Sequence, residues 1–163
     1  MGNGSQDKPA VAAIGVYFGP ECRANRGKIV RDETRSSTNN MAELMAIIEA
    51  LRLARRWSIK KVEIRTDSKW AADYFAVSRR IRLADAKRGK IKWRPNDHLF
   101  FEIEQLCETM ESVKFTTVKA HFTDVNNILA DKLATEAIAN FLAENATSEQ
   151  ANLQALALDN LNP

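Results

Sequence analysis

Apolar and polar residues follow two different periods along this chain, and together they predict alternating strands and helices. Apolar residues occupy alternate positions over residues 11–19, and short β-branched or aromatic runs occupy 27–30, 62–66 and 115–118. A period of two is the spacing of side chains that face one side of a strand. The sequence therefore predicts four short strands.

Apolar residues at helical spacing mark four other segments. Residues 40–57 and 95–106 carry apolar side chains three and four positions apart, and residues 68–77 and 125–137 also have a helical pattern. Such a stripe packs against a sheet or another helix. The order of elements predicts an α/β fold, with a mixed sheet of about four strands flanked by helices.

Length and composition favour one intracellular domain. The chain has 163 residues, enough for a proper core, and its two cysteines, Cys22 and Cys107, are interpreted as reduced thiols. We find no signal-peptide pattern or membrane span, and nucleus, cytoplasm and mitochondrion are equally compatible with the sequence. We expect a domain over 1–143 and an acidic, flexible tail over 144–163, with one helical turn near 153–158.

The formal net charge of +3 hides a strongly basic segment. Residues 79–94 contain eight Lys or Arg against the single Asp85, and Trp93 lies among them with Trp70 upstream. A solvated loop is one interpretation, but cations interleaved with aromatic rings favour contact with a nucleic acid. We therefore expect a phosphate-binding surface in this segment.

Three carboxylates and one histidine are the candidates for catalysis. Glu43 lies near the start of a predicted helix, Asp67 follows a predicted strand, and His121 and Asp131 lie near the start of the last helix. Converging carboxylates suit Mg²⁺, and histidine titrates near neutral pH. Ordinary structural roles are the alternative. Glu43 could form a capping box with Asn40, and Asp67 could cap a helix. Asp131 could be a solvated helix residue, and His121 could be a loop histidine satisfied by the backbone.

A series of motifs follows these elements in a specific order. It comprises a GNG turn, the strand AAIGVYFGP, the helix TNNMAEL, the strand end RTDS, the basic segment, an Asn at a helix start, and the ending AHFTDVNNILADKLA. Each part is weak alone, but their order and spacing are specific. From about residue 3 to about residue 142, the chain resembles type 1 ribonuclease H.

This resemblance implies an endonuclease that hydrolyses the RNA strand of RNA/DNA hybrids by two-metal-ion catalysis. By position, it makes Glu43, Asp67 and Asp131 the metal ligands and His121 a mobile catalytic histidine. The implied cofactor is Mg²⁺, with Mn²⁺ as an alternative. The implied partner is the hybrid, and the implied fold is the family's mixed sheet with flanking helices.

The resemblance also implies contacts with the substrate. Asn39 and Asn40 match residues at the shallow groove of the hybrid, where amides can bond 2′-hydroxyl groups. Thr38 and Asn96 match a pocket for a phosphate of the DNA strand, and Trp70 matches an aromatic residue that guides this strand. The basic residues that we expect to grip the substrate are Arg79, Arg80 and Lys90.

The front of the chain departs from the family pattern. In the family, a strand ending in Asp-Gly-Ser or Asp-Gly-Cys precedes the GNG turn, and its Asp binds both metals, whereas here this turn begins at Gly2. We expect a truncated first strand, with Asn3 and Asp7 as poor substitutes for that ligand. Ala120 also replaces a glycine that commonly precedes the loop histidine. Slow cleavage by the chain as it stands is therefore predicted.

Two further hypotheses remain open. One is a catalytically impaired hybrid-binding or regulatory domain, because the first metal-binding Asp is missing. The other is a transposase or integrase core that acts on DNA. The TNN motif and Asn96 suit the recognition of hybrids, so they argue against the DNA-acting core.

Overall fold

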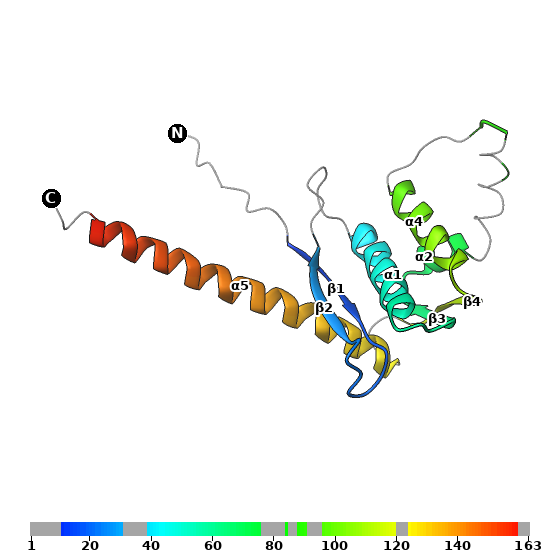
Figure 1. Ribbon diagram of the computed structural model, residues 1–163, viewed down its shortest axis with the longest axis horizontal. Coiled ribbons are helices and arrows are strands. Elements are labelled where there is room, and N and C mark those ends of the chain that lie inside the picture. Colours follow the sequence, from blue (N-terminus) through cyan, green and yellow to red (C-terminus); the bar gives the residue numbers. More distant parts are fainter. Residues whose placement is uncertain are drawn as a thin grey trace.

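The computed structural model shows helices packed against paired strands (Figure 1). The structure describes residues 11–30, 39–75, 84, 88–90, 96–119 and 124–159, with side chains described as far as residue 148. Within these ranges, no helix is both long enough and apolar enough to cross a membrane. The α/β class expected from the sequence is confirmed.

The described residues contain four strands, which form two separate pairs. Strands β1 (Ala12–Val16) and β2 (Arg26–Val30) are antiparallel, whereas β3 (Lys61–Thr66) and β4 (Ser112–Thr117) are parallel. The four strands predicted from the sequence are confirmed. Among the described residues, however, no strand joins β1 to β3, so two two-stranded sheets take the place of one four-stranded sheet.

In the described ranges, four helices lie around these strands, and each begins close to where the apolar pattern predicted it. They are α1 (Asn39–Arg56), α2 (Lys69–Asp73), α4 (Asp97–Glu108) and α5 (Val125–Asp159). Helix α2 is capped by Ser68, whose side-chain oxygen accepts a hydrogen bond from the N–H of Ala71. The predicted end of this helix at residue 77 lies outside the described residues.

Helix α5 is longer than the sequence pattern indicated. It continues without interruption to Asp159, although only a single helical turn was expected near residues 153–158. No glycine or proline interrupts its 35 residues, and alanine and leucine, strong helix formers, recur along it. Figure 1 shows α5 crossing β1 and β2 and then extending beyond them. The division of the chain at residue 143 stays a prediction.

The buried core lies between α1, α4 and the strands. Leu44 and Leu51 of α1 and Ile103 of α4 are its fully buried large side chains. The ring of Phe100 on α4 packs 3.8 Å from that of Tyr74, which follows α2. Among the described side chains, none from α5 belongs to this core. The apolar residues of α1 and α4 therefore supply most of the helical contribution to it.

Two glycines allow α5 to cross the first strand pair closely. A Cβ atom on Gly15 would lie 1.8 Å from the backbone oxygen of Ala130, and one on Gly27 would lie 2.0 Å from that of Leu133. A larger residue at either position would push the helix away, because real Cβ contacts are never this short. The close crossing fixes the position of α5 at Ala130 and therefore also places Asp131, the next residue of the helix.

Candidate active site

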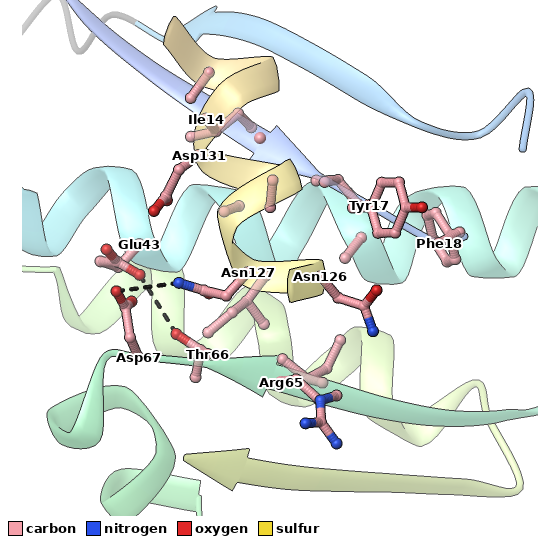
Figure 2. Close-up of a pocket in the computed structure, with 18 of the residues that line it drawn as sticks. Ile14, Tyr17, Phe18, Glu43, Arg65, Thr66, Asp67, Asn126, Asn127 and Asp131 are labelled. Atoms are coloured by element: carbon pink, nitrogen blue, oxygen red, sulfur yellow. Dashed lines mark hydrogen bonds between the residues drawn. The ribbon is translucent and has the colours of Figure 1, made fainter. Parts of the chain in front are cut away.

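The three predicted catalytic carboxylates come together from three different elements. Glu43 lies in the second turn of α1, Asp67 directly follows β3, and Asp131 lies in the second turn of α5. All three line one cavity of about 520 Å³ that also touches β1 and β3, which we name the inter-sheet cavity. Figure 2 shows them at one end of it. Residues far apart in the sequence thus form one acidic cluster.

Two polar side chains link this cluster together. The hydroxyl group of Thr66 donates a hydrogen bond to Oε2 of Glu43, with 3.4 Å between the oxygens. The side-chain amide of Asn127 donates to Oδ2 of Asp67 over 3.4 Å, as the dashed line in Figure 2 indicates. These bonds connect the end of β3 with both α1 and α5. The carboxylates are therefore oriented by neighbours on other elements.

Sequence reasoning missed both of these linking residues, although each leaves a signal. Thr66 directly precedes Asp67, so it ends the same strand and lies beside the same cluster. Asn127 precedes Asp131 by four residues, and residues four apart lie on the same face of a helix. A search for polar neighbours of each candidate carboxylate at these spacings would have found them.

The electrostatics of the cluster act most strongly on Glu43. Its pKa is raised above the ordinary value, first by burial and then by the negative charge of Asp67. The hydrogen bond from Thr66 partly opposes this effect, and Asp131 adds to it. A proton or a cation placed between these carboxylates would relieve the repulsion.

The first turn of α5 is held by Asp124. Its Oδ1 atom accepts hydrogen bonds from the backbone N–H groups of Asn126 and Asn127, over 3.0 and 3.1 Å. This is the geometry of a helix N-cap. Its other carboxylate oxygen pairs with the Arg65 guanidinium of β3. The start of α5, including the linking residue Asn127, is thereby tied to the β3 strand.

Two of the ordinary structural interpretations are wrong. Ser68 caps α2, so Asp67 is not its N-cap, and the carboxylate of Asp67 faces Asn127 instead. Asn40 is already within α1, which begins at Asn39, so a capping box between Asn40 and Glu43 does not form. Neighbouring polar residues compete for the capping position, and sequence alone does not separate them.

The carboxylates of the cluster are suitable ligands for a divalent cation. In this structure, however, they are not close enough together to coordinate one. Carboxylate oxygens are the ligands that Mg²⁺ and Ca²⁺ prefer. The pKa of Glu43 is raised first by burial and then by the negative charge of Asp67, with a smaller contribution from Asp131, and a cation would neutralise these charges. In the described part of the chain, no three His, Cys, Asp or Glu side chains lie close enough together to enclose a metal ion.

The predicted substrate contacts are only partly described. Asn39 and Asn40 are exposed on the first turn of α1, and Lys90 is exposed and directly follows a turn at residues 88–89. Trp70 is 44% exposed, and its ring lies edge-on to Phe100 with 5.0 Å between centroids. The predicted residues that lie outside the described ranges are Thr38, Arg79, Arg80 and His121, as are Asn3, Asp7 and Ala120.

Asn96 has an unusual backbone conformation at the start of α4. Its φ angle is +69°, in the left-handed region, and its side chain makes no capping hydrogen bond. Asparagine tolerates this region better than most residues. The side chain is therefore not committed to the cap, and its predicted role at a phosphate pocket stays a prediction.

Comparison with known proteins supports one family. The family model described as RNase H matches residues 2–139. A Ribonuclease H from Clostridium botulinum strain Hall is 28% identical over 149 residues, which cover 86% of this chain and 90% of that protein. A Ribonuclease H from Orientia tsutsugamushi strain Boryong is 33% identical over 133 residues, covering 78% of this chain and 73% of that protein.

Solved structures show the same fold. RNase H1 from the halophilic archaeon Halobacterium salinarum NRC-1 matches with a TM-score of 0.59 and 24% identity, over 83% of this chain and 92% of that one. LC11-RNase H1, solved in complex with an RNA/DNA hybrid, matches with a TM-score of 0.60 and 23% identity, over 85% of this chain and 94% of that one. The expected fold is confirmed, and the chain belongs to the ribonuclease H family.

Proposed function

We propose that this chain hydrolyses the RNA strand of RNA/DNA hybrids with the help of divalent metal ions. One observation carries the proposal: Glu43, Asp67 and Asp131 converge at one end of the inter-sheet cavity from three separate elements. The relatives named Ribonuclease H and the hybrid-bound structure of LC11-RNase H1 support the choice of substrate.

The three carboxylates would hold Mg²⁺, or Mn²⁺ in its place. Bound in a pair, such ions activate water and neutralise charge on a phosphodiester and its leaving oxygen. Glu43 would lose any proton that its raised pKa retains, so occupation of the cluster becomes weaker as the pH falls. Asn127 and Thr66 would keep Asp67 and Glu43 oriented.

Polar, aromatic and basic residues elsewhere in the chain would bind the hybrid. Asn39 and Asn40 precede Glu43 by about one helical turn, which puts their amides within reach of a substrate at the cluster. Trp70 offers an exposed face for stacking, Asn96 a side chain for a phosphate, and His121 a group for proton transfer. The cations expected to contact phosphates are Arg79, Arg80 and Lys90.

The test is cleavage of a hybrid with a labelled RNA strand in Mg²⁺, beside double-stranded RNA and double-stranded DNA. Replacing Asp67 by Asn should lower the rate at least about a hundredfold, because metal-assisted charge stabilisation contributes several kcal/mol. Asp73→Asn is a matched control, since Asp73 pairs with Lys69 on the exposed side of α2 and should not affect the rate. Equal cleavage of all three substrates, or an unchanged rate in Asp67→Asn, would contradict the proposal.

A hybrid-binding domain with impaired catalysis is the second candidate. It is favoured by the spacing of the carboxylates, because no three described His, Cys, Asp or Glu side chains lie close enough together to hold a metal ion. In that case the chain would bind hybrid without cleaving it, and neutralising Arg79, Arg80 and Lys90 would weaken binding and flatten its salt dependence. Binding and cleavage measured on the same preparation distinguish the two functions.

A further inference from the structure

A group of basic residues surrounds the turn that follows α1, at the opposite end of this helix from Glu43. Four cations there are exposed: Arg55, Arg56, Lys60 and Lys61. Within the described part of the chain, none of the four forms an ion pair. Of the nearby carboxylates, Glu63 is paired with Lys114, and Glu111 contacts Lys60 through its backbone N–H. Positive charge is therefore in excess, and we name these four cations together with Trp57 the α1-end surface.

The turn at the centre of this surface is closed by backbone hydrogen bonds. The N–H of Ser58 donates to the carbonyl of Arg55 over 3.0 Å. The N–H of Ile59 donates to the carbonyl of Ala54 over 2.9 Å. Ser58 has a φ angle of +57°, in the left-handed region. Together these are the features of a Schellman motif, which ends a helix with one left-handed residue. The turn therefore has a defined conformation that fixes the backbone of Trp57, the residue directly after α1.

The side chain of Trp57 is 53% exposed. Its ring makes no stacking contact with another described aromatic residue, whereas the ring of Trp70 packs edge-on against Phe100. An exposed tryptophan that stands alone needs no functional explanation. Here, however, two cations directly precede Trp57 and two follow it within four residues. An aromatic ring between cations offers a planar ligand a stacking surface and offers its charged groups counterions.

A groove between α1 and α4, of about 640 Å³, adjoins the turn. Arg55 lines it from α1, and the exposed Gln105 lines it from α4. Arg52 also lines this groove, but its guanidinium group is paired with Glu102. The charge of Arg55 and the amide of Gln105 could therefore bind an anionic group that enters the groove.

Two simpler interpretations do not account for this arrangement. Cations suit the C-terminal end of a helix, which explains the two arginines but not the two lysines beyond the turn. A membrane surface would need several apolar side chains beside its cations. Of the exposed large apolar side chains described at the turn, Trp57 and Ile59, the second lines the inter-sheet cavity instead. A single ring among cations matches a single-stranded nucleic acid, which presents both unpaired bases and phosphates.

The α1-end surface is separate from the acidic cluster. Glu43 and Arg55 lie roughly 18 Å apart along α1, because each helical residue rises about 1.5 Å. Lys61 begins β3, whereas Asp67 follows the other end of this strand. The two regions therefore lie at opposite ends of both elements.

We propose that the α1-end surface is a second binding site, which takes single-stranded RNA or DNA. Trp57 stacks on an unpaired base, and the cations on either side of it contact neighbouring phosphates. Binding at this site needs neither the three carboxylates nor a metal ion. The inference therefore goes beyond the proposed cleavage, and failure of either proposal leaves the other standing.

The test uses the full chain, a metal chelator and two labelled probes, a twelve-nucleotide oligothymidylate and an oligouridylate of the same length. Fluorescence anisotropy measures their affinities. Trp57→Ala should lower the affinity for a probe at least about fivefold, because stacking on one base is lost. Trp57→Phe should retain most of the affinity, since phenylalanine also stacks. A loss with both probes identifies a site for either nucleic acid, and a loss with one probe identifies RNA or DNA as the ligand.

The salt dependence of binding tests the cations. Each phosphate contact with a single strand contributes about 0.7 to the slope of log affinity against log salt concentration, so Arg56→Gln should flatten the slope by this amount. Lys132→Gln is the matched control, because Lys132 is also an exposed helical cation but lies on α5, where it pairs with Glu136. It should leave the slope unchanged.

NMR locates the contact on the chain. The indole N–H signal of Trp57 is identified by its absence from the spectrum of Trp57→Phe, and it should shift as oligothymidylate is added. An unchanged indole signal, or equal affinities of Trp57→Ala and the unmodified chain for both probes, would overturn the proposal. Equal salt slopes in Arg56→Gln and Lys132→Gln would also contradict it. Vesicles of phosphatidylglycerol and phosphatidylcholine that bind the unmodified chain but not Trp57→Ala, with oligonucleotide binding unaffected, would make this a membrane surface instead.

Discussion

Helices α1 and α5 each bring one carboxylate to the same site, but the protein holds these two helices in different ways. Eight residues of α1 are buried, including the fully buried Leu44 and Leu51. Over residues 125–148, α5 has no buried residue, and Val125 and Ile128 are 67% and 42% exposed. Close backbone crossing at two glycines and the Asp124–Arg65 ion pair hold α5, whereas side-chain burial holds α1. The site therefore joins a firmly packed element to a weakly packed one.

This difference matters for the chemistry of the cluster. Glu43 is presented by the buried helix, whereas Asp131 depends on the crossing of α5 over β1 and β2. Local opening is easiest where few apolar contacts are buried. We expect the position of Asp131 to be the most readily disturbed of the three carboxylates. The following predictions test this contrast, in order of decreasing effect.

The largest expected effect is the loss of a core side chain from α1. Leu51→Ala should lower the free energy of unfolding by about 2–5 kcal/mol, because Leu51 is fully buried and its loss leaves a cavity. Ile128→Ala on α5 should change it by about 0.5 kcal/mol or less, since this side chain is substantially exposed. Urea denaturation measures both. Similar losses of unfolding free energy in the two variants would show that α1 and α5 are held equally firmly, and would contradict the contrast between them.

Crowding the crossing of α5 should have the next largest effect. Gly15→Ala places a Cβ atom against the backbone of Ala130, so we expect a loss of about 1–3 kcal/mol. Hydrogen exchange should speed up mainly in α5 and leave α1 nearly unchanged. Exchange that accelerates equally in both helices would mean that α5 is as firmly integrated as α1.

Removing Asp124, the N-cap of α5, should lower stability by less than Gly15→Ala does, and the size of this loss should depend on pH. The pKa of Asp124 is lowered, first by the hydrogen bond from Arg65 and then by that from the Asn127 N–H. Because this pKa is lowered, the ionised form of Asp124 stabilises the folded state at pH values above 3.8, its ordinary pKa. This stabilisation is lost as the pH falls through the pKa of Asp124 in the folded state.

Asp124→Ala should therefore lower the thermal midpoint near neutral pH, by less than Gly15→Ala does. The difference from the unmodified chain should shrink in acid. Thermal melts followed by circular dichroism between about pH 7 and pH 3 provide the measurement. A difference that stays constant over this range would show that the charge of Asp124 contributes nothing.

Neutralising Glu43 should change stability in the opposite direction, raising the thermal midpoint at neutral pH where Asp124→Ala lowers it. Its pKa is raised by burial and by neighbouring carboxylates, so ionisation of Glu43 opposes folding, and stability falls as the pH rises from 4.5 through the raised pKa. Glu43→Gln should stabilise the metal-free chain at neutral pH while removing hybrid cleavage. Comparison of thermal midpoints at acidic and neutral pH tests this, and a destabilised variant at neutral pH would be inconsistent with it.

Local patterns in the sequence were sufficient to predict the elements of this fold. Alternation over residues 11–19 and helical spacing over 40–57 each reflect which side of one element is buried. This side is determined by residues that are close together in the sequence. The separation of the described strands into two pairs, β1 with β2 and β3 with β4, is different, because it depends on which strands meet in space. No local pattern contains that information.

The sequence singled out the three carboxylates but not the residues that support them, and the catalytic role of the carboxylates stays a prediction. Motif order identified Glu43, Asp67 and Asp131, and the structure brings all three to one cavity. The hydrogen bond between Asn127 and Asp67 joins residues 60 positions apart, so it exists only after folding. The length of α5 was missed because polar composition suggested a flexible tail, although strong helix formers and the lack of glycine and proline favoured a continuous helix.

The most direct test of the account is whether the carboxylates from the two regions act on one another. The measurement is the pKa of Glu43 by NMR titration in the metal-free chain and in the variants Asp67→Asn, Asp131→Asn and Asp73→Asn. We predict that this pKa falls in the first variant, falls by less in the second, and is unchanged in the third, since Asp73 is paired with Lys69 outside the cluster. An unchanged pKa of Glu43 in both Asp67→Asn and Asp131→Asn would contradict the existence of a shared acidic cluster.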